Sequence, residues 1–332
     1  MITRRQWLTT TSALAAGLAG GRLVATAATA GTAATTPGTS ATPAPAPNAP
    51  ILRTIPSTRE SLPVIGLGTN NYSPTTLEER LARRVVLERL PQLGGRVVDT
   101  APAYRESEKV LGELMAELGN RERLFLATKV TAPEGSAERG RAMIEESFRR
   151  LQTARIDLLQ VHNLDGLEPL MPELQSLKRT GRIRYVGITT SRAEQYPAML
   201  AAMRRHPLDF IQVDYSLGNR AAAEAILPLA RQRRQAVLVN LPFGGRRDGN
   251  LFARVRERAL PPWAAEFGAG SWGQLFLKYV ISHPAVTAVI PGMTKLANLE
   301  DNSRAGVGAL PDEAMRRRIE EFWDREIATA AT

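Results

Sequence analysis

Residues 124–162 read LFLATKVTAPEGSAERGRAMIEESFRRLQTARIDLLQVH. Two short apolar runs, Leu124 to Lys129 and Ile156 to His162, enclose a charged segment with helical periodicity, Glu138 to Leu151. Near-continuous apolar runs are typical of parallel strands that are covered on both faces. The stretch therefore predicts a strand, a helix and a second strand parallel to the first.

The same alternation extends through most of the chain. Six further apolar runs lie at Val64 to Gly68, Arg96 to Thr100, Ile183 to Thr189, Phe210 to Asp214, Ala236 to Asn240 and Val286 to Ile290. Helix-periodic segments lie between them at Leu77 to Leu93, Glu106 to Leu118, Leu167 to Thr180, Glu194 to Arg205, Ala221 to Gln235 and Trp272 to Ser282. Eight strands followed by helical sequence predict an α/β fold, a single-domain (β/α)8 TIM barrel of about 250 residues. An open doubly wound sheet is the alternative, but no G-x-G-x-x-G follows the first predicted strand.

The first 50 residues differ in composition from the predicted barrel, which spans residues 51–332. Residues 1–30 contain the pair Arg4-Arg5, then a weakly apolar stretch rich in Ala, Gly and Thr, then small residues that suit cleavage. This order predicts a twin-arginine signal peptide, because the apolar stretch is too short for a membrane helix. Residues 31–50 are mostly Thr, Ala, Pro and Gly, which predicts a disordered spacer. We expect the twin-arginine export machinery to carry the protein to the periplasm or the extracellular space, with no stable membrane span in the mature chain.

Composition excludes several other classes of site. The chain has no cysteine and three histidines, which excludes disulfides and Cys-ligated metals and leaves few other ligand sets, so no metal site is predicted. The net charge is +10, but the basic residues are scattered along helical segments without a nucleic-acid-binding pattern. We therefore expect a small-molecule partner and no nucleic acid.

Ionisable residues end three successive predicted strands. Asp99, Lys129 and His162 close the second, third and fourth strands, and Tyr104 lies in the loop after Asp99. In a barrel these ends converge at the mouth, where the functional sites of such folds lie. A salt bridge between Asp99 and Lys129 without catalytic duty is the structural alternative. The pattern predicts that Asp99, Lys129 and His162 lie within reach of one another and that the loop can bring Tyr104 over the same mouth.

Seven segments in order resemble the aldo-keto reductases: Gly66-Leu-Gly-Thr69, Asp99-Thr-Ala-Pro-Ala-Tyr104 with Ser107-Glu108, Phe125-Leu-Ala-Thr-Lys129, Asp157-Leu-Leu-Gln-Val-His162, Gly187-Ile-Thr-Thr-Ser191, Ile211-Gln212 and Ile290-Pro-Gly292. The resemblance implies an NAD(P)H-dependent reductase that converts aldehydes or ketones to alcohols by direct hydride transfer. Tyr104 is the implied general acid, since a phenol holds its proton at neutral pH. Lys129 would stabilise the phenolate, Asp99 would hold Lys129, and His162 would hydrogen-bond the carbonyl oxygen.

The resemblance also implies a set of cofactor-binding residues. They are Gly68, Thr69, Thr189, Thr190, Gln212, Asn240, Phe243, Gly244, Pro291, Gly292, Met293, Thr294, Lys295, Asn298, Asp301 and Asn302. The chain departs from the family pattern in four places: Thr189-Thr190 stands for a Ser-Asn pair, Asn240 for an aromatic ring, Asn298 for an arginine, and Gly292 for a lysine that part of the family has. NADP(H) is expected in preference to NAD(H), although the change at Asn298 weakens that preference.

Two other functions compete with the reductase. An exported nicotinamide-nucleotide-binding sensor or partner protein would keep the fold and turn over little. A barrel hydrolase would need paired carboxylates, and no second strand-end carboxylate pairs with Asp99 in the motifs described.

Overall fold

The computed structural model describes residues 49–245 and 249–328. The predicted signal peptide and all but the last two residues of the predicted spacer lie outside these ranges. Two sheets are present within them, one of two strands and one of eight. The strands are β1 (Leu52–Thr54), β2 (Ser61–Pro63), β3 (Leu67–Gly68), β4 (Val97–Asp99), β5 (Phe125–Val130), β6 (Ile156–Val161), β7 (Ile183–Thr189), β8 (Phe210–Asp214), β9 (Ala236–Asn240) and β10 (Ala288–Val289).

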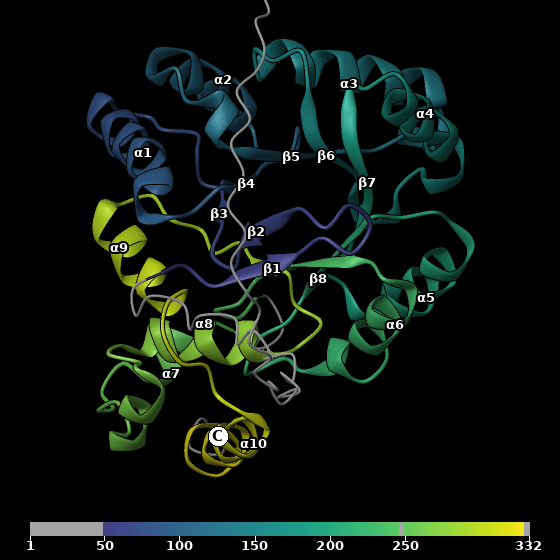
Figure 1. The fold of residues 1–332 in the computed structure, drawn as a ribbon. Coiled ribbons are helices and arrows are strands. Elements are labelled where there is room, and N and C mark those ends of the chain that lie inside the picture. Colours follow the sequence, from purple (N-terminus) through teal and green to yellow (C-terminus); the bar gives the residue numbers. More distant parts are fainter. Residues whose placement is uncertain (1–48, 246–248, 329–332) are drawn as a thin grey trace, which may run out of the picture. The chain divides into compact units, whose positions relative to one another are not determined.

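The larger sheet closes on itself. Strands β3 to β10 pair in parallel in chain order. The seam is made by parallel bridges from Ile65 to Val289 and from Gly68 to Gly292. Backbones approach so closely there that a Cβ at Gly68 would lie 2.6 Å from the carbonyl oxygen of Ile290. The predicted TIM barrel is confirmed, and Figure 1 shows its helices arranged around the strands.

The helices follow the strands along the chain and cover their outer face. The longer ones are α1 (Leu77–Arg89), α2 (Ser107–Leu118), α3 (Ala137–Arg150), α4 (Leu167–Arg179), α5 (Tyr196–Arg205), α6 (Ile226–Arg233), α8 (Trp272–Ser282), α9 (Leu296–Ala305) and α10 (Glu313–Phe322). Short helical turns are η1 (Leu90–Leu93), η2 (Arg121–Arg123), η3 (Pro133–Gly135), η4 (His162–Leu164), η5 (Ala193–Gln195), η6 (Ala221–Ala223), α7 (Leu251–Arg254), η7 (Pro262–Phe267) and η8 (Trp323–Ala328). In the described part of the chain, no helix combines the length and apolar character that a membrane crossing needs.

Local sequence signals set the ends of these helices. Ser136 caps α3 by accepting a hydrogen bond from the Arg139 amide. The predicted helix Leu77 to Leu93 is divided, because Pro91 lacks an N–H and the chain passes at Leu90 into a 3-10 turn. Helices α9 and α10 lie beyond Trp272 to Ser282, the last helical segment to which the sequence analysis gives bounds.

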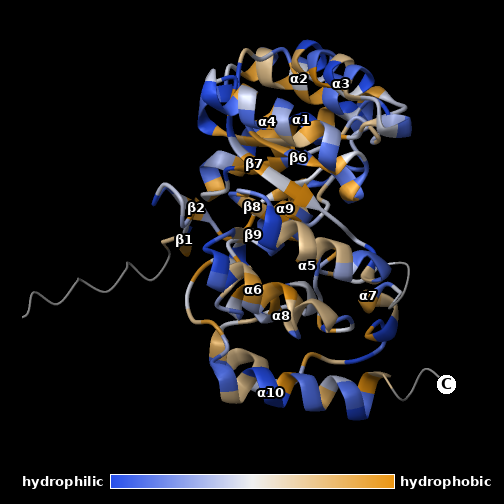
Figure 2. Ribbon diagram, turned by 90° about the vertical axis from the view of Figure 1, so that its right-hand side faces the viewer, coloured by the Kyte–Doolittle hydropathy of each residue, from blue (hydrophilic) through white to orange (hydrophobic). Residues whose placement is uncertain are grey.

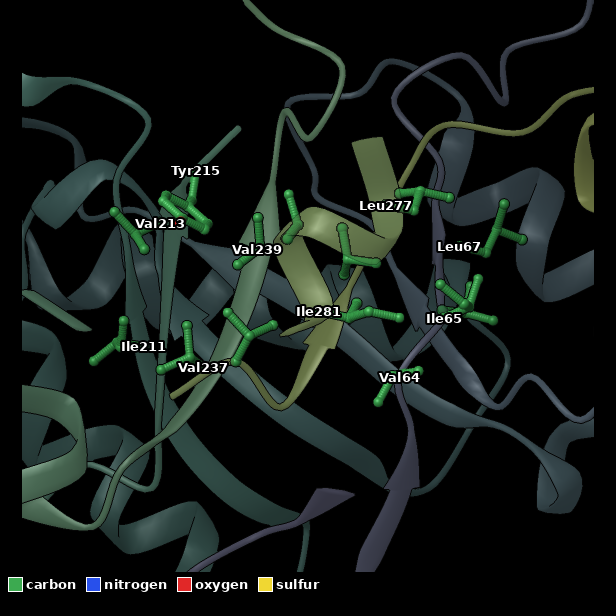
Figure 3. Close-up of a cluster of buried hydrophobic side chains, with 14 of the residues drawn as sticks. Val64, Ile65, Leu67, Ile211, Val213, Tyr215, Val237, Val239, Leu277 and Ile281 are labelled. Carbon is green, nitrogen blue, oxygen red and sulfur yellow. The ribbon is translucent and has the colours of Figure 1, made fainter. Parts of the chain in front are cut away.

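Side chains of the barrel strands divide between two apolar clusters. Outward-facing residues pack beneath the helices, as Figure 3 shows for Val237 and Val239 of β9 near Ile281 of α8. Inward-facing residues form a second cluster that includes Phe125, Tyr185 and Phe210. Figure 2 shows the same order, with apolar strands inside helices whose surfaces carry many hydrophilic residues. The two faces alternate along each strand, as the pleat requires.

The hairpin of β1 and β2 closes one end of the barrel interior. Ile55 and Leu62 are fully buried and belong to the interior cluster with Phe125, Tyr185 and Phe210. These side chains fill the end from which the parallel strands begin. The polar interior is therefore confined to the opposite end, where the strands finish.

Candidate active site

Asp99 and Lys129 form an ion pair inside the barrel. Asp99 ends β4, and Lys129 lies in β5 two residues after Ala127, so the pleat turns it inward. Lys129 Nζ donates to Asp99 Oδ1 at 2.6 Å and to the Thr100 carbonyl at 2.8 Å. The side chain of Lys129 is 1% exposed and that of Asp99 is 2% exposed. Two opposite charges are thus held together away from water.

Two glutamines complete the surroundings of Asp99. Gln160 Nε2 donates to Gln212 Oε1 at 2.9 Å and approaches Asp99 Oδ2 at 3.4 Å, while Gln212 Nε2 lies 3.5 Å from Asp99 Oδ1. Both are buried. Gln212 is a predicted cofactor residue, whereas Gln160 is missed by the sequence analysis. Its position two residues before His162, on the inward phase of β6, is the signal that could have identified it.

The charge state of the pair follows from its surroundings. Burial opposes the charged form of Lys129, but the Asp99 carboxylate and the Tyr104 hydroxyl outweigh it, and the pKa of Lys129 is raised above its ordinary value. Burial also raises the pKa of Asp99, and the ammonium of Lys129 counteracts that rise. Lys129 therefore presents a permanent positive charge to the groups above it.

Tyr104 lies over this ammonium group. Its ring centroid is 4.9 Å from Lys129 Nζ and 6.1 Å from the centroid of the His162 ring. The loop that carries it is fixed by hydrogen bonds from the Tyr104 amide to the Ala101 carbonyl and from Ser73 Oγ to the Tyr104 carbonyl. The structure therefore brings the four predicted catalytic residues together at the ends of β4, β5 and β6.

His162 lies edge-on to the Tyr104 ring. Burial, followed by the positive charges of Lys129 and Arg192, lowers the pKa of His162 to about 4. The ring is consequently a neutral donor and acceptor at neutral pH. Asn163 and Leu164, directly after it, both have positive φ, at 52° and 62°. Asparagine adopts this left-handed backbone more readily than most residues, whereas it is uncommon for leucine.

A cavity of about 780 Å³ opens above Tyr104 and His162. This volume is suited to a small organic molecule. Its other described lining residues come mainly from the loops after β3, β6, β7, β8 and β9. Those that the sequence analysis does not predict include Asn70, Asn163, Ser191, Arg192, Glu194, Asp214, Tyr215, Ser216, Asn219, Leu241 and Gly245. Their positions after strand ends could have indicated that they line the cavity. Most of them are residue types that are common in any loop, so the sequence alone does not distinguish them.

A barrel with this group at its mouth agrees with comparison to known proteins. A model of the aldo/keto reductase family matches residues 64–324. The chain belongs to this family.

Individual relatives of this aldo/keto reductase are distant. The chain is 32% identical over 209 residues to the aldo-keto reductase YhdN of Bacillus subtilis. The match covers 58% of this chain and only 61% of that protein. It is 28% identical to the methylglyoxal reductase YeaE of Escherichia coli, over 73% of this chain and 85% of that one. A solved aldo/keto reductase from Klebsiella pneumoniae, in complex with NADP and acetate, shares 25% identity with a TM-score of 0.62, over 80% and 93% of the two chains.

Four predicted cofactor residues of this aldo/keto reductase lie at the ends of β7, β8 and β9. Thr189 pairs with Gln212 across β7 and β8, and the Thr189 hydroxyl accepts from the Asn163 amide at 3.3 Å. The Thr190 hydroxyl donates to Gln195 Oε1 at 2.6 Å. Asn240 Oδ1 is buried and has no hydrogen-bond partner among the described residues. An orphaned amide oxygen at the mouth suits a ligand that carries an N–H group.

Phe243 and Gly244 lie in the loop after β9. The Phe243 ring packs on Phe252 with centroids 4.9 Å apart. Gly244 has φ of 87°, and a Cβ there would lie 2.0 Å from the Gly249 carbonyl oxygen. The conformation of this loop therefore requires glycine.

The remaining predicted cofactor residues border the barrel seam and the start of α9. Gly292, Lys295 and Asn298 are exposed, Thr294 is partly exposed, and Pro291, Met293 and Asn302 are buried. Asp301 accepts hydrogen bonds from Ser271 and Gln274, both at 2.7 Å. Thr69 is buried and donates to the Asp99 carbonyl at 2.9 Å. Some predicted residues are thus free to meet a ligand, and others already have protein partners.

No arrangement for a metal ion is found in residues 49–245 and 249–328. Groups of three or more His, Asp or Glu side chains positioned to hold one do not occur there.

Proposed function

We propose that this protein reduces aldehydes or ketones to alcohols, using a nicotinamide cofactor as hydride donor and Tyr104 as general acid. The observation that carries the proposal is the cavity wall, where Tyr104 and His162 stand beside each other above the buried pair of Lys129 and Asp99. The relatives include a methylglyoxal reductase and a structure in complex with NADP and acetate, which supports the same chemistry.

The residues at the mouth fit a nicotinamide group. Asn240 offers a buried oxygen without a partner, and Gln212 and Thr189 lie on the adjoining strands. These residues would hold the carboxamide, and the bound nicotinamide would supply the hydride. At the beginning of α9 no side chain caps the helix, and the exposed Lys295 stands at its N-cap. Backbone N–H groups with a lysine suit a phosphate of the cofactor, which favours NADP(H) over NAD(H).

The four catalytic residues divide the work of proton transfer. Tyr104 gives its phenolic proton to the carbonyl oxygen as hydride reaches the carbon. Lys129 stabilises the phenolate that remains, and Asp99, Gln160 and Gln212 keep the lysine in place. His162, neutral because burial lowers its pKa, donates a hydrogen bond to the same oxygen and orients it.

An optical assay of cofactor oxidation tests this function. With a panel of aldehydes and ketones, the purified chain should oxidise NADPH with kcat of about 1 s⁻¹ or more for its best substrates. NADPH should have the lower KM, because NADH lacks the phosphate that the start of α9 would bind. If cofactor binds tightly but no carbonyl is reduced, the nucleotide-binding sensor is the better description. If neither cofactor binds, only the fold assignment stands.

We also propose that residues 1–30 direct export by the twin-arginine route. The support is the order of the segments that follow Arg4 and Arg5, all of which lie outside the described residues. Cell fractionation should find a shortened chain outside the cytoplasm. Replacing both arginines by lysine should leave the full-length chain in the cytoplasm, and equal export of that variant would contradict the proposal.

A further inference from the structure

Arg192 stands at the mouth of the cavity beside the catalytic residues. It follows β7, occupies the N-cap of η5, and lines the cavity together with Tyr104 and His162. Among the described lining residues it is the one arginine or lysine. Lys129 lies deeper and is already paired with Asp99.

The backbone of Arg192 is fixed, whereas its guanidinium is available. The Arg192 amide donates to Thr190 Oγ1 at 3.0 Å, and the Thr190 hydroxyl is held in turn by Gln195. The guanidinium makes no hydrogen bond or ion pair with the residues that the structure describes. The residue is exposed, so its guanidinium faces solvent at the cavity, where a planar cation can bind a carboxylate or phosphate through two parallel hydrogen bonds.

The carboxylates on the same wall have partners of their own. Asp214 accepts from the Tyr196 hydroxyl at 2.9 Å and from Asn219 Nδ2 at 2.7 Å, one donor at each oxygen. Glu194 is likewise engaged by the protein. Neither carboxylate forms an ion pair with Arg192. The positive charge of Arg192 is thus left for a ligand.

The wall around the reactive phenol is polar. Asn70 and Asn163 line the same cavity as Tyr104 and His162. Amide groups hydrogen-bond hydroxyl and carbonyl oxygens and offer little to a large apolar ring. Arg192 is also near enough to His162 to contribute to the lowered pKa of that imidazole. A ligand held by Arg192 therefore needs only a short chain to place a carbonyl beside His162.

We infer that the substrate is a short, hydrophilic carbonyl compound with an anionic group, such as an oxo acid, whose carboxylate or phosphate binds Arg192. This inference rests on the proposed reductase function and adds the substrate class to it. A phosphate of the cofactor is the other possible anion. Arg192 follows β7, whereas Lys295, which we propose to bind a cofactor phosphate, follows β10. The substrate is therefore the anion that we assign to Arg192.

The test compares two substrates of equal carbon number, 4-oxobutanoate and butanal. The wild-type enzyme should have a higher kcat/KM for 4-oxobutanoate. Arg192→Gln should lower the ratio of kcat/KM for 4-oxobutanoate to kcat/KM for butanal by about 10-fold to 100-fold. The change should come mainly from a higher KM for 4-oxobutanoate, because one charge-assisted contact with its carboxylate is lost. Arg192→Lys should recover part of the ratio. Arg204→Gln, an exposed position on α5 with the same charge change, should leave the ratio as it is.

Each other result overturns a different statement. Equal loss with both substrates would make Arg192 a structural residue. Weaker NADPH binding in a fluorescence titration, with the ratio unchanged, would assign the guanidinium to the cofactor. Wild-type turnover of butanal without preference for 4-oxobutanoate would defeat the inference alone. If neither carbonyl nor any other is reduced, the proposed function fails, and calorimetry with succinate then decides whether Arg192 still binds an anion: binding that is lost in Arg192→Gln supports it, and binding that is unchanged overturns it.

Discussion

Replacing Tyr104 by phenylalanine should lower kcat by about 1,000-fold while leaving the Kd for NADPH within about twofold of the wild-type value. The substitution removes one hydroxyl and keeps the ring that packs beside His162 and Lys129. Without that hydroxyl, the alkoxide formed by hydride transfer has no positioned proton donor. Single-turnover oxidation of NADPH measures the chemical step, and fluorescence titration measures cofactor binding.

Tyr185→Phe is the matched control for this variant. It removes a tyrosine hydroxyl from the other end of the barrel interior, where that group contacts Thr58 and Glu60. Its kcat should stay close to that of the wild type. A Tyr104→Phe enzyme with normal kcat would exclude Tyr104 as the acid.

The dependence of kcat on pH tests the charge state of His162. In the wild type, we expect no inflection from His162 in a plot of kcat against pH between about pH 5 and pH 8, because burial lowers the pKa of His162 to about 4.

Lys129→Met should both abolish turnover and destabilise the fold by about 3–5 kcal/mol. The variant leaves Asp99, which is 2% exposed, without its counter-ion. Urea unfolding gives the free energy, and the NADPH assay gives the rate. Asp99 in the variant can escape its charge by taking up a proton, because burial raises its pKa. The folded state then binds more protons than the unfolded state, so the loss of stability should grow as pH rises.

A double variant separates the two roles of Lys129. Asp99→Asn with Lys129→Met removes both charges and should regain much of the lost stability, since no buried charge is left unpaired. Its activity should stay low, because no cation remains beneath Tyr104. Recovery of activity together with stability would show that the lysine acts only through folding. A single variant as stable as the wild type would contradict the buried ion pair.

The alternation of strands and helices was enough to predict both the barrel and the meeting of Asp99, Lys129 and His162. Each of these residues ends an apolar run, and in a closed parallel sheet the ends of all strands meet at the same mouth of the barrel. Gln160 escaped prediction although it shares the inward phase of β6 with His162. Arg192 could not be distinguished in the sequence, because it is one of 43 basic residues and its significance depends on having no partner.

The sequence could not show which predicted cofactor residues already have hydrogen-bond partners elsewhere in the protein, because those partners are distant in the chain. Asp301 is held by Ser271 and Gln274, roughly one barrel repeat earlier in the chain, and nothing local in the sequence marks that choice. The two strands at the seam are also shorter than the apolar runs predicted for them. Pairing at Ile65 and Gly68 is reduced to isolated bridges, so β3 and β10 contain only two residues each.

The hairpin of β1 and β2 closes one end of the barrel interior. Ile55 and Leu62, packed with Phe125, Tyr185 and Phe210, leave a hydrocarbon floor beneath Asp99 and Lys129. Water and hydronium cannot reach the ammonium through that floor. In the proposed reaction, the proton that replaces the one given up by Tyr104 therefore returns from the mouth of the barrel, where Tyr104 and His162 line the cavity. Reprotonation of the enzyme and departure of the proposed product would then take place at the same end of the barrel, and a product that leaves slowly would delay both.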